Sequence, residues 1–450
     1  MNGHLHDIRH SIGGRAREVL QALPTPGGDT FGEGSAGILE MLGEYGAALL
    51  ASSLATTDVE DTLYQLARRY GRQQLRICVL PTLILIEDPA EEPAQTLIFP
   101  ALPQALRLDQ AGRVEMAVRK ALVQPKSSKE MLASLSEILA GPPRFGPVLK
   151  ILGNMLLTVG FGLVLNPTIS AIPVYLVLGL MVGIIVTWGS RAATLSLVLP
   201  ILTAFLVTVL VGIVALPLVH GGVLMLVAPS LVPFLPGLSL TIAAVELTTG
   251  QVLSGASRLV YGLAGLGLLS FGVYVGLQVT HFPPAESSGL SQLGQWAPWA
   301  GLVPVSLGYV LFMSAPRGSF LWILFATVVS YGAQLLGEYL VGAELSGLVG
   351  AIIVIPAVTL AGRLPSAPSP AIMLTCAYWV LVPGAMGFIG LSEVATGTSG
   401  AANTMLQTLA SIIAIAIGMV LGSGITHDAA LAVRAWRGEE ASGTGKTAQG

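Results

Sequence analysis

The chain has 450 residues, of which 53% are hydrophobic and only 10% are charged, and its mean hydropathy is +0.75. A soluble globular protein carries roughly 25% charged residues, so this composition excludes an ordinary soluble protein. The net charge is only -3 and no basic patch with interleaved aromatic residues occurs, which argues against a nucleic-acid partner. Since residues 151–427 hold only four basic and five acidic side chains, the sequence predicts a polar N-terminal part followed by a membrane domain.

The N-terminal part divides into a polar tail, residues 1–36, and a small cytoplasmic α/β domain, residues 37–145. The tail lacks the apolar core of a signal peptide, so we expect the N-terminus to stay in the cytoplasm. Thr57 with Glu60 indicates a capping box, Ser127 indicates a second cap, and Gly71 indicates a helix end. The expected elements are helices over 37–55, 57–70, 111–123 and 128–140 and strands over 75–80, 83–87 and 96–99.

This domain contains no motif that indicates an enzyme. It has no Walker loop, no dinucleotide fingerprint, no HExxH and no GxSxG. Asp58, Glu60 and Asp61 could form a metal or acid/base site, but a negatively charged first helical turn facing the helix dipole is the favoured interpretation. Cys78 and Cys376 lack metal-ligand spacing and are expected to be buried. We therefore expect no catalytic residues, no metal and no cofactor.

The membrane part contains ten apolar runs that are each long enough to cross a bilayer. With the N-terminus inside, all nine Lys and Arg residues from Arg144 onward fall on the cytoplasmic side, as the positive-inside rule requires. This also places the C-terminal tail, residues 428–450, in the cytoplasm. The expected spans are 148–166, 171–189, 192–216, 222–248, 257–280, 297–314, 319–336, 342–361, 370–392 and 403–425.

One motif occurs twice within these spans, 147 residues apart, with the spacing Pro-Gly-x8-Glu-x3-Gly. The first copy begins at Pro236-Gly237 and the second at Pro383-Gly384. The repetition predicts a duplicated unit of five helices, residues 146–285 and 286–427. Five is an odd number, so the second unit runs in the opposite direction through the membrane. Inverted repeats are typical of alternating-access transporters, and the expected fold is an α-helical polytopic membrane protein of ten helices with this 5+5 inverted repeat.

Each Pro-Gly pair predicts a break near the centre of its helix, because proline removes a donor and glycine permits a sharp turn. Pro236, Gly237, Pro383 and Gly384 are therefore candidate substrate-binding positions, whose freed backbone groups can contact a substrate; a kink used only for packing is the alternative. Further candidates for substrate binding are polar residues that otherwise make helix-to-helix hydrogen bonds. They are Ser239, Thr241, Thr375, Tyr378, Asn403 and Gln407.

The motif's two carboxylates, Glu246 and Glu393, are candidates for proton coupling or gating. Ten residues separate Glu246 from Pro236, which is about 15 Å along a helix and half of a ~30 Å hydrocarbon core. Both glutamates are then expected near the membrane interfaces. There they are either simply solvated, or paired in the case of Glu246 with Arg258, or placed at opposite mouths of a transport pathway.

Several segments in succession resemble the threonine/serine exporter family. They include Gly43-Glu44-Tyr45-Gly46, the stretch from Asp58 to Leu63 and Val79-Leu80-Pro81-Thr82 in the first half, and Leu381-Val382-Pro383-Gly384 in the second. The resemblance covers residues 37–425. In two respects the chain departs from the family: Leu83 and Leu85 are more apolar, and Glu246 stands where aspartate is expected.

The resemblance implies export of threonine and serine, driven by protons, across a bacterial cytoplasmic membrane. Export of a dicarboxylate such as succinate is the alternative that the family allows. Independently of the family, the absence of an ATP site favours secondary transport. A membrane enzyme is disfavoured because His, Asp and Cys are nearly absent from the spans, and a channel would not need inverted broken helices. The sequence leaves the oligomeric state open, a homo-oligomer included.

Overall fold

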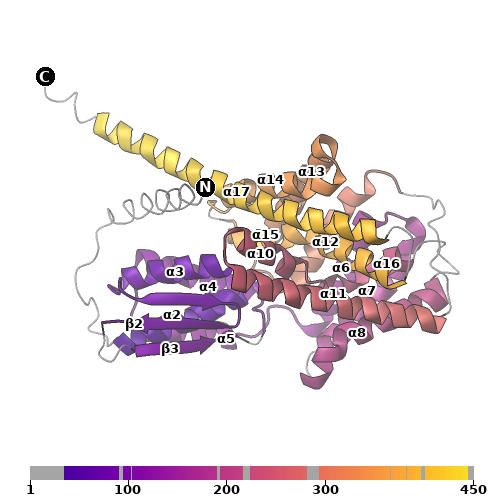
Figure 1. Cartoon of the computed structure of the whole chain (residues 1–450), viewed down its shortest axis with the longest axis horizontal. Helices are drawn as coiled ribbons and strands as arrows, with labels where there is room; N and C mark the ends of the chain where they lie inside the picture. The colour runs from indigo at the N-terminus through magenta and orange to yellow at the C-terminus, as the bar shows by residue number, and fades with distance from the viewer. Residues whose placement is uncertain are drawn as a thin grey trace. The chain divides into compact units, whose positions relative to one another are not determined.

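A computed structural model of the chain describes residues 35–90, 95–102, 104–189, 193–215, 223–280, 293–364, 366–381, 383–396 and 401–443. It separates into two compact units. The N-terminal unit comprises residues up to 105 together with 113–141, and the membrane unit comprises 106–112 and the chain from 142 onward. Each unit is described by itself (Figure 1).

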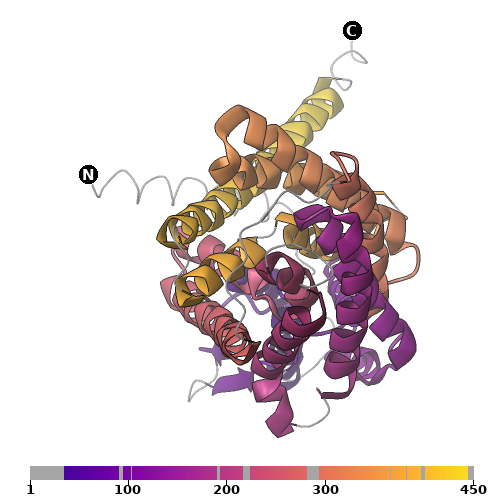
Figure 2. The ribbon, with the colours of Figure 1, turned by 90° about the vertical axis from the view of Figure 1, so that its right-hand side faces the viewer.

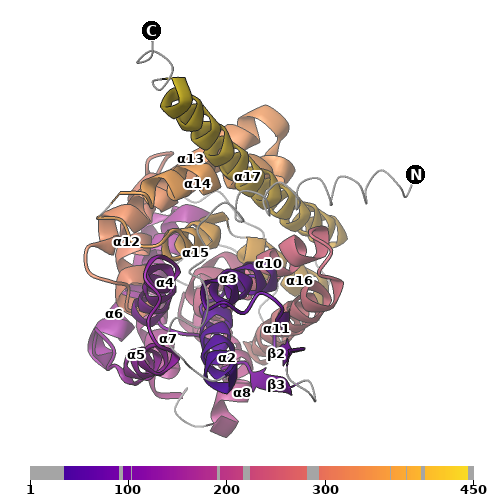
Figure 3. The same ribbon diagram turned by 90° about the vertical axis from the view of Figure 1, so that its left-hand side faces the viewer.

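The N-terminal unit combines helices with one antiparallel sheet in the order β1-β2-β3, and α2 and α3 lie against the sheet (Figure 3). Every element that the sequence predicts for this region is present. Helix α4 begins in the membrane unit and continues into this one. The elements are α2 (Ser35–Ala51), α3 (Thr56–Arg69), β1 (Arg76–Leu80), β2 (Leu83–Asp88), β3 (Gln95–Pro100), α4 (Leu108–Val123) and α5 (Ser128–Ala140).

Alternation along the strands decides which side chains enter the core of this unit. Ile77 and Val79 of β1 and Ile84 and Ile86 of β2 are buried, because residues two apart share one face of a strand, and this face meets α2 and α3. Cys78 lies between two buried neighbours and is exposed. The prediction that this cysteine is buried was therefore wrong, since the apolar character of a residue does not tell which face of a strand it occupies.

The ends of the helices test the capping predictions. Ser127 accepts a hydrogen bond from the Glu130 backbone N–H at 3.2 Å, and Gly71 has a φ of +74° just after α3, so both were predicted correctly. The capping box at Thr57 was wrong. Helix α3 begins one residue earlier, at Thr56, and its N-cap is Ala55, which makes no side-chain cap.

The acidic residues at the start of α3 do not converge on one site. Asp58 and Asp61 are exposed, whereas Glu60 is half-buried. Burial raises the pKa of Glu60, and a hydrogen bond from the Val79 backbone lowers it. Among the described residues, no three His, Cys, Asp or Glu side chains are grouped so that they could hold a metal ion.

The membrane unit is a bundle of helices (Figure 2). They are α6 (Pro147–Leu165), η1 (Ile169–Ala171), α7 (Ile172–Gly189), α8 (Ala193–Leu210), η2 (Val211–Ala215), α9 (Val223–Val227), η3 (Ala228–Phe234), α10 (Gly237–Thr248), α11 (Val252–Thr280), α12 (Ala297–Phe312), α13 (Ser319–Val341), η4 (Ala343–Leu345), α14 (Ser346–Ala361), α15 (Pro370–Leu381), α16 (Pro383–Thr396) and α17 (Ala401–Gly443).

Six of the described helical stretches are long and apolar enough to cross a membrane, or up to seven if a bent pair counts as one span. The polytopic membrane fold is thereby supported, whereas the predicted number of ten spans is not confirmed. Three further apolar helices are shorter, at Val198–Val214, Ala297–Phe312 and Pro370–Leu381. Proline bounds one of them, since Pro370 opens α15 and Pro383 opens the next helix, α16. Pro304, by contrast, lies inside α12.

Helices α6 and α12 approach each other closely, because glycines stand at the contact. Gly153 lies against Gly308, and about two helical turns further along α6, Gly160 lies against Gly301. A Cβ added at Gly153 or Gly160 would come within 3 Å of backbone atoms of α12. As numbers rise along α6 they fall along α12, so the two helices run antiparallel. Small residues that let backbones approach are the usual means of helix association in lipid.

Helix α17 is longer than expected. The sequence predicts an end at residue 425 and a separate tail from 428, but the helix continues to Gly443. The stretch beyond residue 427 is rich in Ala, Arg and Glu, which are strong helix formers, and proline is absent from it. Hydropathy locates the end of an apolar run, not the end of the helix that contains it.

Candidate functional site

The first Pro-Gly pair breaks its helix. The segment Val223–Phe234 and the helix Gly237–Thr248 are bent by 69°, with Pro236 as the N-cap of α10 and Gly237 as its first residue. Pro236 offers no side-chain cap, and the first N–H groups of any α-helix lack an intrahelical acceptor. The backbone N–H groups of Gly237, Leu238 and Ser239 therefore form a positive helix end inside the bundle.

The second Pro-Gly pair also lies between two helices. Helix α15 ends at Leu381 and α16 begins at Pro383, followed by Gly384; Val382 lies outside the described residues. Two predicted polar residues precede this break. Tyr378 is buried, and Thr375 donates its hydroxyl hydrogen to the Ala371 carbonyl at 2.8 Å.

The structure brings these two regions together, although 147 residues separate them in sequence. Helix α10 packs against α15 and α16, and η3 packs against α16. Leu231 of η3, Leu240 of α10, and Phe388 and Ile389 of α16 share one buried cluster. The broken helix of the first motif copy thus packs directly against the helices that carry the second copy.

The predicted polar residues differ in their positions. Thr241 is buried and donates its hydroxyl hydrogen to the Gly237 carbonyl at 2.8 Å, so its proton already has an acceptor. Ser239 is half-buried and lies two residues, about half a turn, after Gly237. Asn403 is exposed, and Gln407 is bound to the exposed carboxylate of Glu344 at 3.0 Å. Ser239 and Tyr378 therefore remain the best candidates, while Asn403 does not join the centre.

Glu246 is fully buried, with none of its surface exposed. Its Oε2 lies 3.2 Å from Nε of Arg258, whose side chain is 17% exposed. The pair joins α10 to α11 across a tight turn at Gly250, where φ is +86°, and this positive φ explains why the motif ends in glycine. Of the three sequence interpretations, pairing with Arg258 is correct and simple solvation of Glu246 is wrong.

Glu393, the equivalent carboxylate of the second copy, is half-buried on α16. The residue that corresponds to Arg258 after the same offset is Met405, so the second copy has no matching arginine. Its neighbour Ser392 donates a hydrogen bond to Ser270 of α11 at 3.1 Å. The two motif copies therefore share their sequence spacing and differ in the residue at the position of Arg258.

One group of side chains near the second break was missed at the sequence level. The Tyr309 ring of α12 is fully buried and packs edge-on against Trp379 of α15, with ring centroids 5.3 Å apart. Its phenol group lies beside Thr375. A lone tyrosine in the apolar stretch of α12 was the available signal, because a buried phenol needs a polar neighbour.

The family model described as a threonine/serine exporter, ThrE, matches residues 40–280. The chain belongs to the threonine/serine exporter family. This is a transporter family and not an enzyme family. Family membership and the apolar helices together indicate a multi-pass membrane transport protein. No match was found among curated proteins or solved structures. The exporter match ends at the last residue of α11, so it does not extend to the second membrane half.

Proposed function

We propose that this exporter moves small hydroxylated amino acids, threonine and serine, out of the cell by alternating access, driven by the proton motive force. It does so in the bacterial cytoplasmic membrane, with both termini in the cytoplasm and two inverted repeats, 146–285 and 286–427, on either side of the substrate. The observation that carries the proposal is the packing of the broken helix at Pro236-Gly237 against α15 and α16, which flank the start of the second Pro-Gly copy.

The bounds of the helices support the duplication over its full length. Adding 147 residues to the segment Val223–Phe234 gives residues 370–381, the bounds of α15. The same offset carries Gly237–Thr248 to within one residue of the bounds of α16. With this offset α6 shares the end of α12 and α7 shares the start of α13, whereas α8 and α11 overlap α14 and α17 but end 4 and 16 residues before them. A shared offset along six helical segments is the pattern of an internal repeat.

Inversion of the second repeat is supported by the antiparallel crossing of α6 and α12. At one end of this pair, Arg144 Nη1 donates to the Ala315 carbonyl at 2.7 Å. At the other end, the Leu293 N–H donates to the Pro167 carbonyl at 2.9 Å. The packing is also exchanged in the way that a two-fold axis requires, since α10 packs against α17 and α16 packs against α11.

The chemistry of the two breaks suits an amino acid. The free N–H groups at the start of α10 attract a carboxylate, as helix N-termini do in transporters with broken helices. Ser239 and Tyr378 supply hydroxyl groups that match the hydroxyl of serine or threonine. Glu246 and Glu393, on the two halves of the repeat, are proposed to gate or couple the cycle by exchanging protons.

Transport itself is tested with the purified chain in proteoliposomes. Labelled L-threonine and L-serine are expected to move when a pH gradient is imposed, and to stop when a protonophore removes it. Labelled succinate, tested in parallel, is expected not to be transported. Movement of succinate alone would make the chain a dicarboxylate exporter, and movement of none of the three would refute the proposal.

Replacing either motif carboxylate, Glu246→Gln or Glu393→Gln, is expected to uncouple threonine transport from the pH gradient, because glutamine cannot exchange a proton. The rate of movement down a threonine gradient, measured at several pH values, separates coupling from binding. Glu344→Gln, an exposed carboxylate of η4, is the matched control. Full pH dependence in both motif variants would show that the glutamates have a structural role only.

A further inference from the structure

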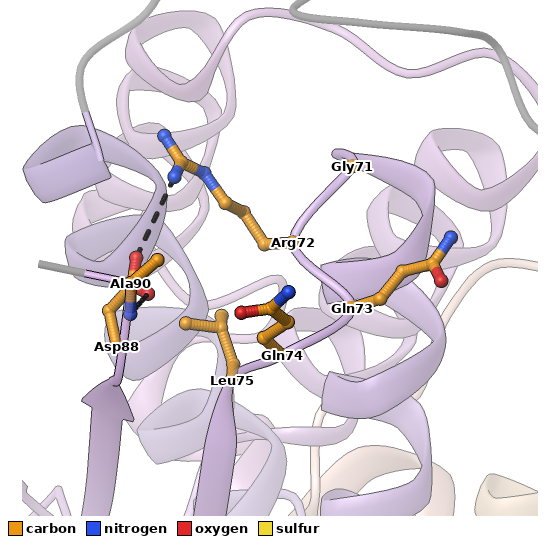
Figure 4. Close-up of a pocket in the computed structure, with 7 residues that line it drawn as sticks. All are labelled: Gly71, Arg72, Gln73, Gln74, Leu75, Asp88 and Ala90. Carbon is orange, nitrogen blue, oxygen red and sulfur yellow. Dashed lines mark hydrogen bonds and ion pairs between the residues drawn. The ribbon is translucent and has the colours of Figure 1, made fainter.

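The N-terminal unit contains a cavity of about 320 Å³ that the transport proposal does not use. It lies where α3 ends and β2 ends (Figure 4). Small-molecule sites range over roughly 300–1,000 Å³, so this cavity suits a small metabolite rather than a nucleotide. Its lining residues are Gly71, Arg72, Gln73, Gln74, Leu75, Asp88 and Ala90.

Arg72 presents hydrogen-bonding capacity to this cavity. Its side chain is 23% exposed, and its Nε is buried without a hydrogen-bond partner among the described residues. Its Nη1 lies 3.7 Å from Oδ2 of Asp88, which is longer than the roughly 2.7–3.2 Å of an N–H···O hydrogen bond. The ion pair therefore leaves the part-exposed guanidinium group with capacity for a further acceptor, which a ligand carboxylate would supply.

Asp88 places the opposite charge in the same cavity. Its side chain is only 2% exposed, and its Oδ1 accepts the Ala90 N–H at 3.0 Å, which fixes the carboxylate in place. The other oxygen faces Arg72 across the cavity. A cation and an anion thus stand near each other in one small space, as an ion pair at 3.7 Å.

We propose that this cavity binds a small zwitterion, whose carboxylate contacts Arg72 and whose ammonium group contacts Asp88. Guanidinium groups bind carboxylates through two parallel hydrogen bonds. The amides of Gln73 and Gln74 supply partners for a side-chain hydroxyl. Phosphates and dicarboxylates are disfavoured, because Asp88 repels the second negative charge. The identity of the ligand rests on the proposed function: it is the exported amino acid itself, sensed by the N-terminal unit of its own exporter.

The experiment is equilibrium dialysis of labelled L-threonine against the full-length chain in detergent. Wild type is expected to bind two molecules per chain, one in the membrane unit and one at Arg72. Arg72→Gln is expected to bind one, through a loss of affinity of tenfold or more at the second site. Asp88→Asn, a second variant, is expected to do the same. Arg76→Gln is the matched control, since Arg76 lies on β1 and pairs with Glu87 at the surface.

The outcomes separate this site from the transport proposal. One molecule per chain that persists in Arg72→Gln and Asp88→Asn overturns the cavity site and leaves transport intact. A second outcome is that wild type binds one molecule per chain, both variants bind none, and proteoliposomes show no transport. This outcome supports the cavity site and refutes the exporter mechanism. N-acetyl-L-threonine lacks the ammonium group and is expected not to compete with labelled L-threonine at this site. Full competition would show that Asp88 does not bind the ammonium group.

Discussion

Arg258→Gln is expected to destabilise the chain by about 3–5 kcal/mol, the cost of removing one member of a buried ion pair. Glu246 is wholly buried, so without Arg258 its carboxylate would remain as a charge in an apolar setting. The measurement is thermal unfolding of the detergent-solubilised chain, followed by the fluorescence of its 6 tryptophans. The midpoint of the variant is expected to lie well below that of wild type.

The double variant Glu246→Gln/Arg258→Gln is expected to recover most of this loss, because it leaves no charge behind. Arg363→Gln, an exposed arginine, is the control and should be neutral. If the unfolding midpoint of Arg258→Gln equals that of wild type, the ion pair contributes nothing to stability.

Local patterns in the sequence predicted most of the elements. The alternating runs that became β1 to β3 and the cap at Ser127 depend on neighbours in the chain, and the structure follows them. The break at Pro236-Gly237 belongs to the same class, because proline and glycine act on their own backbone. Features decided within a few residues are those that a sequence can reveal.

Features decided by distant residues were predicted less well. The exposure of Cys78 depends on which face of β1 meets α2 and α3, and the full burial of Glu246 depends on helices that pack around it. Distance along the helix left solvation, pairing with Arg258 and a gating role open, because it says nothing about a residue's neighbours. The cavity between Arg72 and Asp88 joins two residues sixteen positions apart that no spacing rule connects.

Gly308→Leu is expected to prevent assembly of the membrane unit. A Cβ at this position would lie 2.6 Å from the Gly153 carbonyl oxygen and 2.6 Å from the Leu157 backbone nitrogen. Overpacking usually costs roughly 1–3 kcal/mol when side chains can move. Here the obstacles are backbone atoms of α6, so the helices must separate and the cost is expected to reach or exceed the top of that range. Size-exclusion chromatography of a fluorescent fusion measures the fraction of correctly assembled protein.

Gly267→Leu is the matched control, because this glycine lies within α11 and a Cβ there would meet nothing within 4 Å. It is expected to assemble like wild type. Gly153→Leu should repeat the defect of Gly308→Leu, since Gly153 faces the same crossing from α6. If both variants assemble as well as the control, α6 and α12 do not cross at these glycines. The antiparallel contact that supports an inverted second repeat would then be lost, and the inversion would depend on the packing of α10 against α17 and of α16 against α11 alone.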